Sequence, residues 1–229
     1  MPDKTKELAI YLKPTEFIDS DSPQVIEYAR SAAGNSRADI DKAVRLYYAV
    51  RDDIKYDPYR LDLSRYGMKA STTLEKKYGF CITKAALLAA TSRVMGIPSR
   101  LHFADVKNHF TSKRLLKMMQ TDIFIYHAYT ELYLDGKWVK ATPAFNLLLC
   151  KISGVQPLEF DGRNDSIYQH FDRDGNKNME YLKDRGTFAD LPYTELTQAF
   201  NEYYQKLITS NPNIAKGDFE SETISGSLR

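Results

Sequence analysis

Residues 81–95 are the part of the sequence that most constrains the fold. Small and aliphatic side chains fill almost every position from Ile82 to Met95, and Gly96 and Pro98 end the pattern. A helix on a protein surface has a polar face, and this segment has almost none. We therefore predict a helix that is buried on most sides, around which the rest of the chain must pack.

The chain before this helix carries mostly helical patterns. A serine followed by Pro23 is a helix-start signal, and apolar residues recur at helical spacing between positions 40 and 54. The predicted segments are a strand or extended arm at 8–12 and helices at 23–33, 36–54 and 74–78, the last capped by Ser71 or Thr72 and ended by Gly79.

The chain after the buried helix changes to strand patterns. Asp135-Gly136 is a dipeptide that favours two-residue type I′ turns, so we predict a hairpin of strands 122–134 and 137–141. The other predicted segments are a strand at 99–104, a short basic helix within 108–120 capped by Thr111, a polar irregular region at 160–186 and an amphipathic helix at 194–208.

This order of elements predicts an α+β fold, in which a helical N-terminal part packs on a mostly antiparallel sheet. The sequence contains no internal repeat and no convincing linker. We therefore expect one domain over residues 1–209, with its core at about 43–146, and a flexible tail over residues 210–229.

The overall composition disfavours several functional classes. The 32 basic and 30 acidic residues give a net charge of +2, so no strong field directs the chain to nucleic acid or membrane. No apolar run reaches the ~18 residues that span a bilayer, and the N-terminal residues lack the apolar core of a signal peptide. We therefore expect a cytoplasmic protein whose two cysteines stay reduced. The composition indicates no oligomeric state.

Cys81 lies where the buried helix begins, and the local sequence leaves two interpretations open. Backbone N–H groups and the helix dipole lower the pKa of a thiol at a helix N-terminus, which favours a nucleophile. Free cysteine is also among the most frequently buried residue types, and the local pattern alone favours this structural interpretation.

The predicted hairpin places a candidate base near a hydrogen-bonding partner. Its turn sets Glu131 opposite Lys140 and Tyr129 opposite Thr142, so His127 and Thr142 lie diagonally on one face. Such residues are within side-chain reach of each other. A histidine and the partner that orients it are two members of a catalytic triad whose third member is a cysteine.

Two stretches resemble a known family. They are GFCITKAALLAATSRVMGIPSR and HAYTELYLDGKWVKATP, with support from RDDIKYDPY and ASTTL upstream. Together they resemble the transglutaminase-like superfamily of papain-fold cysteine enzymes over about residues 43–144. The resemblance implies a papain-like core in which the nucleophile helix packs on the sheet.

The resemblance also implies roles for single residues. Cys81 matches the nucleophile of the family and His127 matches its general base. Thr142 stands where the family has an aspartate, and Asn146 is an alternative orienting residue. These matches imply acyl transfer from an amide or peptide bond, by hydrolysis or transamidation, on a peptide or protein substrate. Because the aspartate is missing, a non-catalytic binding module that keeps the cleft is the alternative.

The remaining candidates favour structural interpretations, and we expect no cofactor and no metal. His102 and His109 lack the spacing of a zinc site. The segment 172–178 has its glycine at the wrong position for an EF-hand and is interpreted as a turn. Cys150 is expected to be buried and inert. The basic helix within 108–120 is interpreted as a surface helix, with a lid over the cleft as the alternative, and this insert is the first candidate for substrate specificity.

Overall fold

The computed structural model describes residues 4–109, 112–168, 179–209 and 219. The helices are α1 (Lys4–Ala9), the 3-10 helix η1 (Ile10–Leu12), α2 (Pro23–Ala33), α3 (Asp39–Asp53), α4 (Ala70–Lys76), α5 (Cys81–Val94), α6 (Lys113–Met119), α7 (Leu147–Ser153), α8 (Tyr193–Tyr203) and α9 (Gln205–Thr209). The strands are β1 (Lys55–Tyr56), β2 (Tyr78–Gly79), β3 (Ser99–Asn108), β4 (Ile123–Leu134), β5 (Lys137–Ala141) and β6 (Met179–Phe188). Over these described residues, no helix combines the length and apolar character that a membrane crossing requires.

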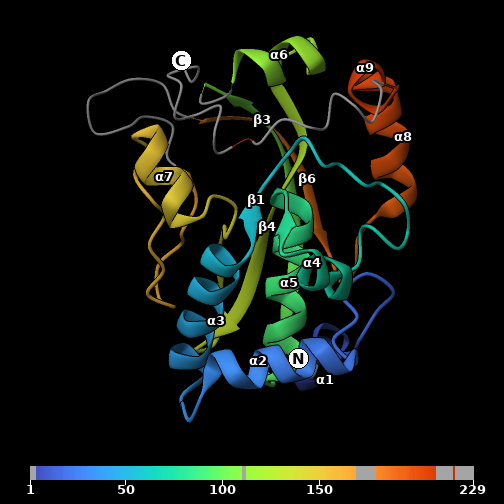
Figure 1. The fold of residues 1–229 in the computed structure, drawn as a ribbon. Coiled ribbons are helices and arrows are strands. Elements are labelled where there is room, and N and C mark those ends of the chain that lie inside the picture. The colour runs from blue at the N-terminus through green and yellow to red at the C-terminus, as the bar shows by residue number, and fades with distance from the viewer. Residues whose placement is uncertain (1–3, 110–111, 169–178, 210–218, 220–229) are drawn as a thin grey trace.

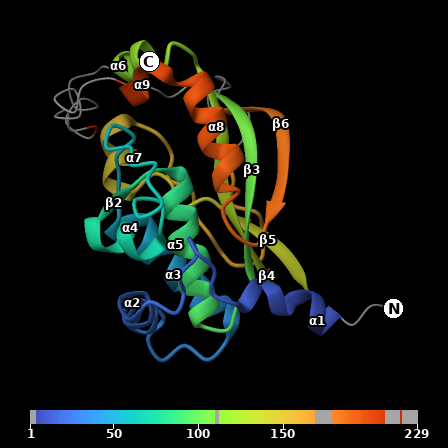
Figure 2. The same ribbon diagram turned by 90° about the vertical axis from the view of Figure 1, so that its right-hand side faces the viewer.

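Helix α5 lies between the sheet and the other N-terminal helices (Figures 1 and 2). Every side chain from Cys81 to Arg93 is buried, which confirms the prediction of a helix without an exposed face. Helices α2, α3 and α4 pack against α5 on one side, and β4 packs against it on the other. The Thr130 hydroxyl of β4 donates a hydrogen bond of 2.8 Å to the Ala85 carbonyl of α5. The fold is α+β, as predicted.

The main sheet has the strand order β5-β4-β3-β6, and every neighbouring pair is antiparallel. The predicted hairpin register is confirmed for the pairs Leu134–Lys137, Tyr133–Trp138 and Glu131–Lys140. Asp135 and Gly136 have φ values of 47° and 84°, as a type I′ turn requires. The pairing of β4 with β5 ends at Thr130–Ala141, so the predicted pair of Tyr129 with Thr142 does not form.

Strand β4 contains an irregular step just before His127. Its pairing with β3 shifts between Ala104 and Val106, and Tyr126 has a φ of 53°. This step turns two backbone N–H groups toward side chains: Tyr126 donates to the Asp105 carboxylate at 3.1 Å, and Ile125 donates to the Tyr204 hydroxyl at 2.7 Å. A bulge of this kind re-aims the side chains that follow it.

Several predictions for the N-terminal half were wrong in their details. Residues 8–12 end α1 and form η1, so they are helical and not extended. Helix α4 begins at Ala70 rather than near Leu74, and it ends at Lys76, with Lys77 (φ of 59°) as its C-cap instead of Gly79. Residues 78–79 form β2, which pairs in parallel with β1. The local sequence did not predict this strand, because its pairing depends on a strand that is distant in the sequence.

The predictions for the C-terminal half were partly wrong as well. The strand predicted at 99–104 extends to Asn108, and part of the region predicted as irregular forms β6. Strand β6 is an edge strand with a largely exposed face, so its sequence lacks a clear apolar alternation. The helix predicted at 194–208 is interrupted at Tyr204. The cap of α6 is Ser112, whose hydroxyl accepts from the Leu115 N–H; Thr111 lies outside the described residues.

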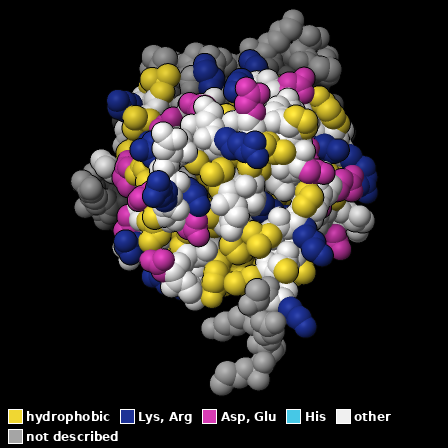
Figure 3. Space-filling view, turned by 90° about the horizontal axis from the view of Figure 1, so that it is seen from below, with side chains coloured by type: hydrophobic (Ala, Val, Ile, Leu, Met, Phe, Trp, Pro, Cys, Tyr) yellow, Lys and Arg dark blue, Asp and Glu magenta, His cyan; other side chains and the backbone are white. Residues whose placement is uncertain are grey.

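Charged side chains of both signs are interspersed over the face seen in Figure 3. This distribution agrees with the nearly balanced composition of the chain. Two exposed apolar residues of η1, Ile10 and Leu12, belong to the N-terminal segment.

Candidate active site

The backbone before Cys81 is fixed on both sides. The Gly79 carbonyl accepts a hydrogen bond from the Asp57 N–H at 2.9 Å, which ties β2 to the chain after β1. A side chain at Gly79 would lie 2.5 Å from the Thr83 hydroxyl oxygen, so the close approach requires glycine. The Thr83 hydroxyl accepts from the Phe80 N–H and so caps α5 from inside the helix. Cys81 therefore starts α5 in a defined position.

The Cys81 thiol is nearly buried, with 9% of the residue exposed. Burial raises its pKa to about 11, while the backbone N–H groups of Ala128, Ile82 and Cys81 act in the opposite direction. The expectation of a lowered pKa at the helix N-terminus was therefore wrong for the resting state, because desolvation outweighs the N–H groups. Cys81 lines a pocket together with residues of β4, the strand that carries His127.

His127 is also buried, and burial lowers its pKa to about 4. In the described part of the chain its Nε2 atom has no hydrogen-bond partner, and no hydrogen bond joins its ring to Cys81. Both shifts favour uncharged forms. The resting site therefore contains a neutral thiol and a neutral imidazole, not a preformed ion pair.

The two candidate orienting residues differ in what they bind. The Thr142 hydroxyl is buried and has no hydrogen-bond partner among the described residues. The Thr142 backbone N–H donates to the Ser166 carbonyl at 3.0 Å, so Thr142 does not continue the predicted pairing with Tyr129. The Asn146 Oδ1 atom accepts a hydrogen bond of 3.1 Å from the Tyr56 N–H, which occupies it at the end of β1. No hydrogen bond joins either residue to His127 in the described part.

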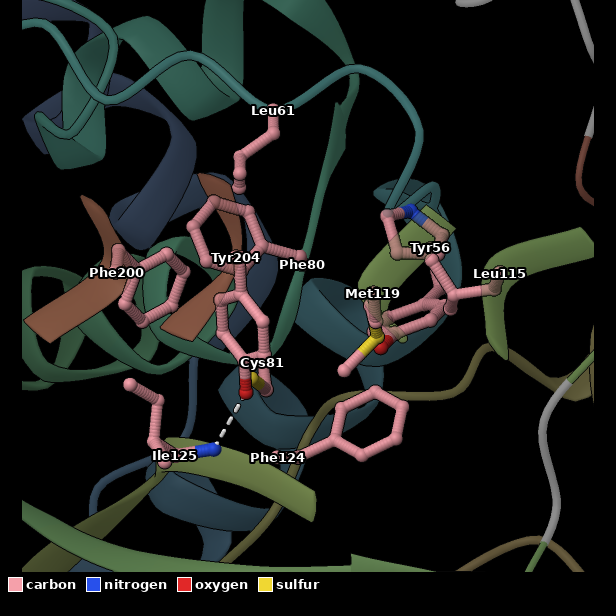
Figure 4. A pocket seen from close by; sticks show the side chains of 11 residues that line it. Tyr56, Leu61, Phe80, Cys81, Leu115, Met119, Phe124, Ile125, Phe200 and Tyr204 are labelled. Atoms are coloured by element: carbon pink, nitrogen blue, oxygen red, sulfur yellow. Dashed lines mark hydrogen bonds between the residues drawn. The ribbon is translucent and has the colours of Figure 1, made fainter. Parts of the chain in front are cut away.

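Cys81 faces a small pocket with a volume of about 40 Å³ (Figure 4). Its lining consists of Tyr56, Pro58, Leu61, Phe80, Cys81, Leu115, Met119, Phe124, Ile125, Phe200 and Tyr204. No charged side chain of the described residues lines it. The walls come from the loop after β1, the start of α5, α6, β4 and the C-terminal helices, which are far apart in the sequence. Helix α6 thus contributes directly to the site.

The other candidate residues lie away from this pocket. His102 bridges Glu131 and Asp184 at 3.1 and 3.0 Å and stacks on Tyr129. His109 contacts Glu180 at 2.7 Å. Both histidines therefore have structural partners.

Cys150 is 1% exposed, and burial raises its pKa to about 11, as expected for an inert thiol. The segment 172–178 lies outside the described residues. Among the residues that are described, no group of three or more histidine, cysteine or acidic side chains is arranged to hold a metal ion.

Sequence analysis missed the aromatic side of the pocket. Phe200 and Tyr204 come after the last strand of the sheet in the sequence, and their helical spacing predicts only that a helix has an apolar face. Phe124 lies within the predicted strand, but its direction depends on the irregular step at Tyr126. No local signal in the sequence assigns these residues to Cys81.

Comparison with known proteins adds a family and a fold. A model of the transglutaminase-like superfamily matches residues 26–143, just over half of the chain. The crystal structure of a candidate cysteine protease from Cytophaga hutchinsonii is similar, with a TM-score of 0.51 and 18% identity over 80% of this chain and 47% of that one. The structure of a candidate protease from Parabacteroides distasonis ATCC 8503 has a TM-score of 0.38 and 17% identity over 52% of this chain and 23% of that one. This chain spans about half the length of the Cytophaga protein, which shares its fold. No curated protein matches the chain.

Proposed function

Because the chain belongs to the transglutaminase-like superfamily, we propose that it is a papain-like thiol enzyme that transfers an acyl group from an amide or peptide bond. Cys81 is the nucleophile and His127 is the general base. The observation that carries this proposal is that Cys81, at the start of α5, lines a pocket with Phe124 and Ile125 of β4, the strand that carries His127. The substrate is a peptide or protein.

The proposed reaction starts from the neutral pair. His127 takes the proton from the Cys81 thiol while the sulfur attacks the amide carbonyl, so that a carbon–sulfur bond forms. The amine then leaves with the proton from His127, and an acyl-enzyme remains. Water attacks this thioester and releases a carboxylic acid and the free thiol; an amine in place of water gives transamidation. The Cys81 N–H is the candidate donor for the oxyanion.

Thr142 is the better of the two candidates for orienting His127. Its hydroxyl and the Nε2 atom of His127 are both buried and both lack partners in the described part of the chain. A buried polar group without a partner is unfavourable, so a hydrogen bond between the two would remove two penalties at once. Asn146 is engaged by Tyr56 and is expected to act on the structure of the site instead.

Alkylation of Cys81 by iodoacetamide tests the pair directly. Its rate is measured between pH 6 and 10 by peptide mapping in the wild type and in His127→Ala, with buried Cys150 as the internal control. We expect Cys81 to react at pH 7.5 at least about tenfold faster than Cys150 and to lose this advantage without His127. Cys81 reactivity that does not change in His127→Ala would sink the assignment. Amine release from peptide amides, absent in Cys81→Ala, then identifies the reaction.

A non-catalytic binding module is the second candidate. It is favoured by the threonine at position 142, where the family has an aspartate, and by the absence of a hydrogen bond between Cys81 and His127 in the described part. This alternative predicts peptide binding that is equal in the wild type and Cys81→Ala, together with no release of amine.

A further inference from the structure

We propose that helix α6 is a lid over Cys81, which must move away before a substrate reaches the sulfur. This inference rests on the proposed function, because it takes Cys81 as the residue that the substrate must reach. It goes further in naming the element that controls access to the site and the side chains that hold this element closed.

The pocket at Cys81 is too small for the substrate of the proposed reaction. Its volume of about 40 Å³ is well below the roughly 300–1,000 Å³ that is typical of ligand sites. Of the Cys81 residue itself, 9% is exposed. A peptide carbonyl has chain on both sides, so it cannot come within bonding distance of the sulfur while every wall of the pocket stays in place. At least one wall must therefore move.

Helix α6 forms one wall of this pocket. Leu115 and Met119 lie about one helical turn apart, are 2% and 4% exposed, and lie across the pocket from Phe200 (Figure 4). Lys113 and Lys117 of the same helix are exposed. The helix is therefore amphipathic, with its apolar side on the site and charged side chains toward solvent. Of the two interpretations that the sequence leaves open for this basic helix, its position favours the lid.

The other walls are tied to the core of the molecule. The Tyr204 hydroxyl accepts from the Ile125 N–H at 2.7 Å and donates to the Ile123 carbonyl at 2.9 Å, which joins the C-terminal wall to β4 (Figure 4 shows the first bond). The chain after β1 is joined to α4 by the ion pair of Asp62 with Lys76, at 2.7 Å. Helix α5 and β4 pack directly against each other. Movement of any of these walls would disturb the main packing of the fold.

Helix α6 lies outside this packing. It is carried between β3 and β4 at one end of the sheet, beside α9 (Figures 1 and 2). The two strands are closed at the base of α6, because Lys107 pairs with Ile123 and the Asn108 N–H donates to the Asp122 carbonyl at 3.1 Å. The helix can therefore swing about this closed base without breaking the pairing of the strands.

Contacts with Tyr59 hold α6 in the closed position. The hydroxyls of Tyr59 and Ser112 are 2.6 Å apart, and the Arg114 guanidinium lies 4.9 Å from the centre of the Tyr59 ring. Ser112 is also the cap of α6, since its hydroxyl accepts from the Leu115 N–H at 3.0 Å. The Tyr59 hydroxyl therefore holds the first turn of the lid, although Tyr59 does not line the pocket. Its removal should weaken the closed position and leave the pocket itself unchanged.

Alkylation of Cys81 by iodoacetamide at pH 7.5 measures how often the lid opens. Tyr59→Phe removes the hydroxyl that contacts Ser112, and we expect Cys81 to react about threefold to tenfold faster, which corresponds to the loss of one hydrogen bond. Tyr28→Phe is the matched control, because it removes a hydroxyl of α2 that donates to Asp53 at 3.0 Å, at the opposite end of the molecule from α6 (Figure 1). The rate in the control should stay within about twofold of the wild type. Equal rates in the two variants would overturn the proposal.

Hydrogen exchange of the wild type tests the lid without a substitution. The Leu116 and Gln120 N–H groups bond to carbonyls at the start and in the middle of α6. We expect these two amides to exchange at least about tenfold faster than the hydrogen-bonded amides of α5, since opening of the lid leaves the core intact. In Tyr59→Phe, exchange should become faster in α6 and stay unchanged in α5. Protection of α6 equal to that of α5 would mean that the helix opens only when the whole protein unfolds, which contradicts a lid.

The two proposals fail in distinguishable ways. If Tyr59→Phe accelerates the alkylation of Cys81 while His127→Ala has no effect on it, the lid stands and acyl transfer fails. If the alkylation depends on His127 but is equally fast in Tyr59→Phe and Tyr28→Phe, the enzyme stands and the lid fails.

Discussion

His127 gives the molecule a specific sensitivity to acid. Burial lowers the pKa of its imidazole to about 4, whereas an unfolded histidine has a pKa of about 6.5. Between these values the unfolded state binds more protons, so acidification favours unfolding. We expect the wild type to lose about 2–3 kcal/mol more than His127→Gln between pH 7.5 and 4.5. Urea unfolding at both pH values measures the difference, and equal losses would show that His127 is not buried as a neutral ring.

Thr142 is predicted to act through a single hydroxyl group. Thr142→Val keeps the shape of the side chain and removes its hydrogen-bonding atom, so the fold should be retained. We expect a loss of about tenfold in acylation rate with little change in KM, because His127 is oriented less well. Thr142→Ser keeps the hydroxyl and should retain most of the rate. A valine variant with wild-type kcat would mean that Thr142 does not orient the base.

Among the elements, those with a local cause were predictable. Helix α5 and the β4–β5 hairpin follow from an apolar run and an Asp-Gly turn, and both are present. The match of Cys81 and His127 to a family motif was equally local. The irregular step at Tyr126, edge strand β6 and the contribution of Tyr204 to the site depend on partners far away in the sequence. Reasoning from local patterns reaches the candidate catalytic pair but not the pocket beside it.

Lys84 joins two of these elements in a way that the apolar pattern of α5 concealed. Its side chain is fully buried, and its ammonium group donates to the backbone carbonyls of Arg51 and Ile54 at the end of α3. A cation in this place also complements the negative end of the helix dipole. Lys84→Met leaves both carbonyls without this donor. We expect it to cost about 2–4 kcal/mol of unfolding free energy.

Urea unfolding checks this expectation against Lys137→Met, which makes the same replacement at an exposed position of β5. The control should change stability by less than about 0.5 kcal/mol. A loss as small in Lys84→Met would mean that the packing of α3 on α5 does not depend on the ammonium group.

At the scale of the whole molecule, Arg93 connects the segment matched by the family model to parts of the chain on both sides of it. Its guanidinium group is 4% exposed and donates to the carbonyls of Lys13, Ser99 and Ala189. The N-terminal segment, the start of β3 and the chain after β6 therefore meet at the end of α5. Asp190 strengthens this junction by accepting from the backbone N–H of Phe17.

Removal of this junction should loosen the C-terminal elements as well as lower stability. Arg93→Met leaves three carbonyls without a charged donor, and we expect a loss of about 3–5 kcal/mol, whereas Arg45→Met on the exposed face of α3 should cost less than about 0.5 kcal/mol. Hydrogen exchange locates the effect: β6 and α8 should lose protection first, because Ala189 and Asp190 lie between them. Since Phe200 and Tyr204 line the pocket beside Cys81, the same variant should also change the rate at which iodoacetamide alkylates Cys81. Unchanged exchange in β6 and α8 would mean that the strand pairing and the aromatic contacts hold these elements without Arg93.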